Sequence, residues 1–260
     1  MIINNEKDDK NMSNVASGAT VDPDEVAFFA AIADSWWDPH GPFKPLHKLN
    51  PTRLKYIRET LCEHFSLDQK SIKPFGGLRI LDIGCGGGLI SEPMTRLGAD
   101  MVSVDASMKN IRVARLHAER SNLEIDYRNV TAESLVEDGE KFDAIINMEV
   151  IEHVADVSAY LSACRSLLKD DGIMLVSTLN RTAKSWLFAI VGAEYVLRWL
   201  PVGAHDWNKF MSPDELTKAL TDASFNSHYL TGFSFAPFSG KWSLSARDTD
   251  VNYAMAALPI

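Results

Sequence analysis

The sequence predicts an α/β protein built on a mostly parallel sheet, and two observations carry that prediction. From residue 78 onwards, short apolar runs alternate with amphipathic segments, which is typical of parallel strands joined by crossover helices. The first apolar run leads directly into a glycine loop, and the second ends at a carboxylate, Asp105. Strand, glycine loop, helix, strand and acid form the order of an α/β nucleotide-binding unit.

Two helices are expected ahead of that unit. Asp22 can cap a helix with Pro23 in its first turn, and this helix would run to Trp36. Asn50 and Pro51 repeat the signal at the start of a second helix. The chain therefore divides into a mobile polar tail (1–21), an N-terminal helical extension (22–75) and a main domain (76–260).

The main domain is expected to form a seven-stranded, Rossmann-like sheet. An antiparallel pair should close its C-terminal edge, because no helix is expected between the last two strands. An apolar insertion (180–212) follows the fifth strand, at the carboxyl end of the sheet where ligands bind in such folds. Its roles could be a buried core helix, a lid over an apolar substrate or a membrane contact. The strand-forming runs are 78–83, 101–104, 123–127, 142–148, 172–179, 228–235 and 251–257.

Composition narrows the class of protein. The formal net charge of −9 argues against a nucleic-acid surface, which is normally basic. The three cysteines are far apart and match no metal spacing, as expected for a reducing compartment. The sequence has neither a signal-peptide pattern nor an apolar run of about 20 residues, so we expect a cytoplasmic protein that is at most peripheral on the inner membrane.

The spacing of the glycine loop indicates its ligand. Gly84, Gly86 and Gly88 form G-x-G-x-G, whereas dinucleotide folds place G-x-G-x-x-G beneath a pyrophosphate. Asp82, just before the loop, would repel a pyrophosphate but suits the ammonium and sulfonium of S-adenosylmethionine. Asp105 can accept hydrogen bonds from two ribose hydroxyls. The alternative is a tight turn without a ligand, and an NAD-dependent oxidoreductase is disfavoured.

Two further residues are candidates for the cofactor site. Arg53 is expected in the first turn of a helix, where a cation opposes the helix dipole and calls for an anion such as the cofactor carboxylate. The alternative is an exposed surface arginine. Met148 ends the fourth strand, and its thioether suits packing against a flat purine.

Glu149, Glu152 and His153 are the candidates for catalysis. In a helical turn they would stand at i, i+3 and i+4, on one face. Together they could hold a divalent cation such as Mg²⁺, which would lower the pKa of a bound catechol hydroxyl. Otherwise one of them acts as a general base, or the acids only complement a helix N-terminus and the histidine packs.

Several stretches of the chain resemble the ubiquinone-biosynthesis O-methyltransferases. The glycine loop resembles motif I of the class I methyltransferases, to which that family belongs. The resemblance extends from about residue 22 to 255. Its more specific matches are FKPLH at 43–47, LNPTR at 49–53, EVIEHV at 149–154, STLNR at 177–181, VGAEY at 191–195 and DVNY at 250–253.

The resemblance implies S-adenosylmethionine-dependent methylation of catechol hydroxyls on polyprenylated intermediates, of the 3-demethylubiquinol and 2-polyprenyl-6-hydroxyphenol types. It also implies membrane association and other ubiquinone-biosynthesis proteins as partners, while the net charge already argues against nucleic acid. A class I methyltransferase for another small apolar acceptor is an alternative, as is a non-catalytic cofactor- or lipid-binding module. The resemblance places the cofactor at Arg53, Gly84, Asp105 and Met148 and links Mg²⁺ to Glu149, Glu152 and His153.

Overall fold

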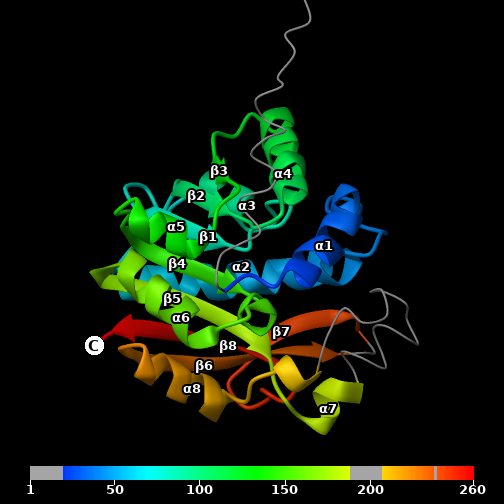
Figure 1. Ribbon diagram of the computed structural model, residues 1–260, viewed down its shortest axis with the longest axis vertical. Helices are drawn as coiled ribbons and strands as arrows, with labels where there is room; N and C mark the ends of the chain where they lie inside the picture. Colours follow the sequence, from blue (N-terminus) through cyan, green and yellow to red (C-terminus); the bar gives the residue numbers. More distant parts are fainter. Residues whose placement is uncertain (1–19, 188–206, 237–238) are drawn as a thin grey trace, which may run out of the picture.

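The computed structural model describes residues 20–187, 207–236 and 239–260. The predicted tail lies almost wholly outside these residues, as does most of the predicted insertion. The strands are β1 (Arg79–Ile83), β2 (Asp100–Val104), β3 (Asp126–Arg128), β4 (Phe142–Met148), β5 (Leu168–Leu179), β6 (Phe225–Ala236), β7 (Lys241–Ser245) and β8 (Asn252–Pro259). Within the described ranges they form one eight-stranded sheet in the order β3-β2-β1-β4-β5-β8-β6-β7 (Figure 1).

The sheet confirms the predicted Rossmann-like class and differs in one strand. β3, β2, β1, β4 and β5 are parallel, whereas β8 runs antiparallel to both β5 and β6. β8 therefore lies inside the sheet, and the additional strand β7 forms the edge. The sequence of β7, KWSLS, alternates only two apolar side chains with polar ones, so it gives no apolar run of the kind that marked the other strands.

The helices of the structure depart from the prediction at the end of the first, which stops at Ile32 before a 3-10 turn (Ala33–Ser35), and at the start of the second. They are α1 (Pro23–Ile32), α2 (Lys44–His64), α3 (Ser91–Arg96), α4 (Met108–Arg120), α5 (Ala132–Glu137), α6 (Val157–Leu167), α7 (Ala183–Ser185) and α8 (Pro213–Asp222). The prediction that the second helix starts at Asn50 is wrong, because Pro45 occupies its first turn and Pro51 lies inside it. The Asn50 side chain instead donates to the Leu89 carbonyl (2.7 Å).

Two layers of helices cover the sheet. Along β1 the side chains alternate between them: Leu81 packs in the core cluster with α5, α6 and α8, and Ile80 packs in the cluster with α2 and α3. Figure 1 shows α5 and α6 over the middle of the sheet and α2 running across it next to β7. None of the described helices is both long and apolar enough to cross a membrane.

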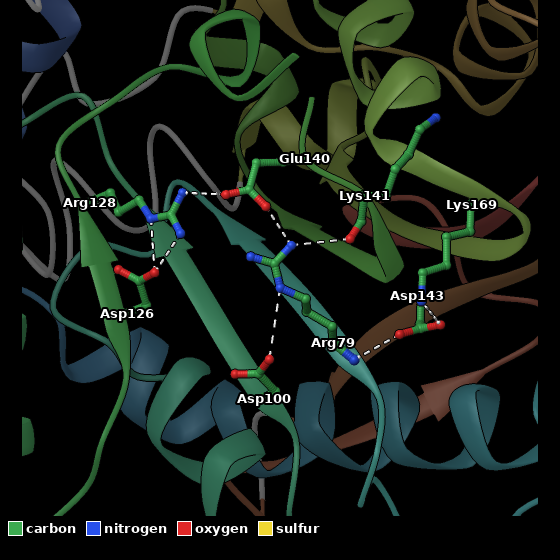
Figure 2. Close-up of polar contacts among 8 residues, drawn as sticks. All are labelled: Arg79, Asp100, Asp126, Arg128, Glu140, Lys141, Asp143 and Lys169. Carbon is green, nitrogen blue, oxygen red and sulfur yellow. Dashed lines mark hydrogen bonds and ion pairs between the residues drawn. The ribbon is translucent and has the colours of Figure 1, made fainter. Parts of the chain in front are cut away.

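An ionic network joins β1, β3, β4 and β5. Arg79, at the start of β1, and Arg128 of β3 both bind the Glu140 carboxylate, with N···O distances of 2.5 and 2.7 Å. Asp143 of β4 accepts from the Arg79 backbone N–H (2.8 Å) and from Lys169 Nζ (2.7 Å). Figure 2 shows these side chains bridging neighbouring strands. The network fixes these strands relative to one another.

Candidate functional site

A cavity of about 600 Å³ opens at the carboxyl ends of the parallel strands. Its wall includes the glycine loop after β1, the residue that ends β2 and the turn that follows β4. The structure therefore brings every predicted site residue to one place, although they span a hundred positions of the sequence. Arg53, Asp82, Gly84, Gly86, Asp105, Met148, Glu149, Glu152 and His153 all line this cavity.

Asp105 is held firmly by the protein itself. Its Oδ2 accepts from the Gly86 N–H (2.9 Å), and its Oδ1 accepts from the Ser107 N–H (2.8 Å) and the Asn110 amide (3.1 Å). Burial raises the pKa of the Asp105 carboxyl, and these three hydrogen bonds oppose that rise. A carboxylate has about four lone-pair sites, so one remains for a ligand hydroxyl and a second would displace a protein donor.

The glycine loop is packed against the N-terminal extension. A Cβ on Gly86 or Gly87 would lie 2.3 or 2.5 Å from the Trp36 side chain, and one on Gly84 would lie 2.5 Å from Val150. Gly84 and Gly86 also have positive φ angles of 69° and 53°, which favour glycine. Close approach of Trp36 is therefore one reason for these glycines, in addition to the room that a ligand would need.

Asp82 and Arg53 are two buried charged residues that line the cavity. Burial raises the pKa of Asp82 to about 7, while the hydrogen bond from Ser91 Oγ (2.6 Å) lowers it. Arg53 lies near the middle of α2, so the prediction that it sits in a first turn is wrong. Its side chain is only 5% exposed and pairs with Glu149, while its Nε is buried without a hydrogen-bond partner. A ligand anion could accept from that donor.

Glu149, Glu152 and His153 do not converge on a common point. Glu149 pairs with Arg53, Glu152 accepts from Thr178 Oγ1 (2.9 Å), and His153 Nδ1 lies 3.1 Å from Glu25 Oε2. A short 3-10 turn holds Ile151–His153, and Glu149 precedes it at a positive φ of 58°. As placed, these side chains do not fit a Mg²⁺ ligand set, and no group of three or more metal-ligating side chains occurs in the described ranges.

The start of the chain supplies site residues that the sequence did not mark as functional. Lys209 Nζ bridges Glu25 (2.9 Å) and Asp22 (3.1 Å), which fixes the beginning of α1 over the cavity. Trp36 Nε1 donates to Asn110 Oδ1 (3.0 Å), and Asn110 in turn donates to Asp105. Asp22 was visible only as a helix cap, and Glu25 lies in the first turn of the same helix; nothing local marks a contact of either with Lys209 or with His153.

Burial and neighbouring charges shift the pKa of His153 in opposite directions. Burial by itself would lower the pKa of His153, but the hydrogen bond to Glu25 and the charges of Glu152 and Glu25 raise it above its ordinary value. Burial raises the pKa of the Glu25 carboxyl, yet His153 and Lys209 together lower it, so Glu25 is an anion that accepts from Nδ1–H. Because Glu25 accepts from Nδ1–H, the neutral form of the ring is the tautomer protonated on Nδ1.

Comparison with known proteins gives close relatives over nearly the whole chain. A family model described as a methyltransferase domain matches residues 50–230. The chain is 60% identical over 239 residues to the ubiquinone biosynthesis O-methyltransferase of Dinoroseobacter shibae, covering 92% of this chain and 96% of that relative. It is 57% identical over 242 residues to the protein of the same name from Cereibacter sphaeroides, covering 93% and 98%.

Solved structures of lower identity share the fold. The magnesium protoporphyrin IX methyltransferase of Synechocystis, determined with bound S-adenosylmethionine, has a TM-score of 0.61 at 17% identity and covers 94% of this chain and 100% of its own. A methyltransferase from Thermotoga maritima has a TM-score of 0.62 at 17% identity, covering 90% and 99%.

Proposed function

The chain belongs to the ubiquinone biosynthesis O-methyltransferase family, and from this premise we propose which residues perform the reaction. The protein is an S-adenosylmethionine-dependent O-methyltransferase of ubiquinone biosynthesis, and its substrate is a polyprenylated compound of the quinone type. We assign it catechol hydroxyls of the 3-demethylubiquinol and 2-polyprenyl-6-hydroxyphenol types. The observation that carries the assignment is a Glu25–His153 pair in the same cavity as the glycine loop.

Each cofactor residue is assigned to the group of S-adenosylmethionine that its own chemistry suits. In this proposal Asp105 accepts from the ribose and Asp82 binds the α-ammonium, and both residues line the cavity. Arg53 offers its unpartnered Nε to the carboxylate, and Met148, only 7% exposed, packs against the purine. Bound S-adenosylmethionine supplies an electrophilic methyl group.

His153 serves as the general base in this proposal. Its Nε2 takes the acceptor's hydroxyl proton while the acceptor oxygen forms a bond to the methyl carbon and the carbon–sulfur bond breaks. Glu25 holds the ring and stabilises the imidazolium that results, as a carboxylate does for a catalytic histidine. The step needs no metal, and none is assigned to Glu149, Glu152 and His153, because each has a separate partner.

The experiment that tests the function is a methyl-transfer assay with a short-tailed demethylubiquinol, with the product identified by mass. A mass gain of one methyl group supports the assignment, and the absence of product contradicts it. The same assay with EDTA and with added Mg²⁺ addresses the metal alternative, because a strict requirement for Mg²⁺ would favour that alternative over a histidine base.

Asp82 is expected to make cofactor binding depend on pH. Only the ionised carboxylate attracts an ammonium, and the pKa of Asp82 in the fold is raised to about 7 by burial. The affinity for S-adenosylhomocysteine should therefore fall as the pH is lowered below that value, by up to roughly tenfold per pH unit. Calorimetry measures this slope.

The variant Asp82→Asn is the control for this prediction. It should bind more weakly than the wild type at neutral pH and show a nearly flat pH profile, since the titrating group is gone. An equal slope in the wild type and in Asp82→Asn would assign the pH dependence to another group.

We also propose that the apolar insertion contacts a membrane surface. Trp186 and Leu187, at the edge of the described part of the insertion, are 48% and 50% exposed, as expected of side chains that enter a lipid interface. The substitution Trp186→Ser should reduce co-sedimentation with liposomes. Unchanged co-sedimentation would leave this proposal without support.

A further inference from the structure

We propose that the apolar tail of the acceptor binds between α2 and the β6–β7 hairpin, with Phe235 and Trp242 selecting for it. This inference rests on the proposed function and deepens it, because it assigns to one wall of the cavity the part of the substrate that is not methylated. The residues that form this tail tract are Leu46, Leu49, Phe233, Phe235 and Trp242, all of which line the cavity.

The hairpin presents its aromatic side chains on one face. Phe235 and Trp242 are register partners across β6 and β7, and their ring centroids lie 5.0 Å apart. Phe233 is two residues before Phe235 and so points to the same side of the sheet, where its ring meets Tyr56 of α2 edge-on at 6.0 Å. The hairpin lies next to α2 (Figure 1), and the contact of Phe233 with Tyr56 shows that this face of the hairpin packs toward the helix.

The facing side of α2 connects the tract to the cofactor site. Leu46, Leu49 and Arg53 follow one another at spacings of three and four residues, so they form one stripe along the helix. The stripe ends at Arg53, the buried cation that we assign to the cofactor. A substrate whose reacting hydroxyl lies at the cofactor can thus extend an apolar chain along this stripe without leaving the cavity.

The exposed fractions of the tract side chains distinguish residues that pack in the core from residues that could contact a ligand. Phe233 and Leu49 are 2% and 4% exposed and belong to the core. Phe235 and Trp242 are only partly buried, although aromatic side chains gain most from complete removal from water. They are therefore the two side chains whose remaining apolar surface a bound hydrocarbon would cover.

The occupant follows from what the rest of the cavity already binds. The glycine loop, Asp82, Asp105 and Arg53 provide the charged and hydrogen-bonding groups that the cofactor requires. The tract offers none of these and is lined by leucine and aromatic side chains. It fits the polyprenyl chain of the acceptor, which is the only long hydrocarbon among the reactants of the proposed reaction.

The test compares two acceptors that differ only in the tail: a catechol ring that carries a short prenyl chain, and the same ring with a methyl group in its place. For the wild type, Phe235→Ser and Trp242→Ser, the measured quantity is the ratio of kcat/KM for the tailed acceptor to that for the untailed one. We expect this ratio to fall by roughly tenfold or more in each variant. kcat/KM for the untailed ring and the affinity for S-adenosylhomocysteine should stay within about threefold of the wild type.

Leu244→Ser is the matched control. Leu244 lies two residues after Trp242 on the same strand and face, packs against the same core cluster, and does not line the cavity. An unchanged ratio in Phe235→Ser and Trp242→Ser would overturn the proposal that the tail binds in this tract. An equal fall of the ratio in Leu244→Ser would also overturn it, because it would indicate general loosening of the hairpin. Failure of the wild type to methylate either ring would instead overturn the proposed function, and the tract with it.

Discussion

The substitution His153→Gln is expected to lower kcat for methyl transfer by roughly 100- to 10,000-fold, the usual contribution of a positioned general base. Glutamine keeps a polar group of similar size at the position but cannot accept the hydroxyl proton. His153 is not assigned to the cofactor, so the affinity for S-adenosylhomocysteine should stay close to that of the wild type. Single-turnover methyl transfer and calorimetry on the same preparation measure both quantities.

The two neighbouring carboxylates are weaker candidates for this role. Glu149 already neutralises the buried Arg53, and protonating it during the reaction would leave that cation without its partner. Glu152 is 4% exposed and is bound by Thr178, and burial raises its pKa. His153 combines a place in the cavity wall with a carboxylate partner, Glu25, which is the arrangement that keeps an imidazole in the correct tautomer.

An assay with an acidic acceptor distinguishes a role of His153 as general base from a purely structural role. A nitro-substituted catechol that is already ionised at the assay pH needs no base, so His153→Gln should methylate it nearly as fast as the wild type does. Glu25→Gln should show a smaller loss with the ordinary acceptor than His153→Gln, because it removes only the orienting partner. Equal losses with both acceptors would assign His153 to positioning or folding.

Much of the fold and of the cofactor loop could be predicted because the signals are local. The strand β4 has the predicted bounds, and the glycines at 84 and 86 have the positive φ angles that the loop requires. The edge strand β7 was missed for a physical reason: an edge strand that is half solvated needs few apolar residues.

The partners of the site residues could not be predicted, because they come from distant segments. His153 and Glu25 are 128 positions apart, and Lys209 and Glu25 are 184 apart. Arg53 was assigned to the site from a helix dipole that does not act on it, since the helix begins at Lys44. Sequence reasoning recognised that this cation needs an anion, and the structure supplies Glu149, a residue that had been given a different role.

The substitution Arg53→Met is expected to have two effects that must be separated. Loss of a charge-assisted hydrogen bond to the cofactor carboxylate should weaken S-adenosylhomocysteine binding by about 1.5–3 kcal/mol, or roughly 10- to 150-fold. The free energy of unfolding should also fall, by about 2–3 kcal/mol, because Glu149 is left in a largely buried position without a cation. Calorimetry of ligand binding and urea unfolding measure the two losses.

The double variant Arg53→Met with Glu149→Gln resolves them. Neutralising both partners removes the uncompensated charge, so the double variant should recover most of the lost stability, as replacement of a buried ion pair by neutral groups commonly does. It should not recover cofactor affinity if Arg53 binds the cofactor directly, because the donor is still absent. Recovery of both quantities together would mean that Arg53 acts through folding alone, and the cofactor carboxylate would then have to be bound by another group of the cavity.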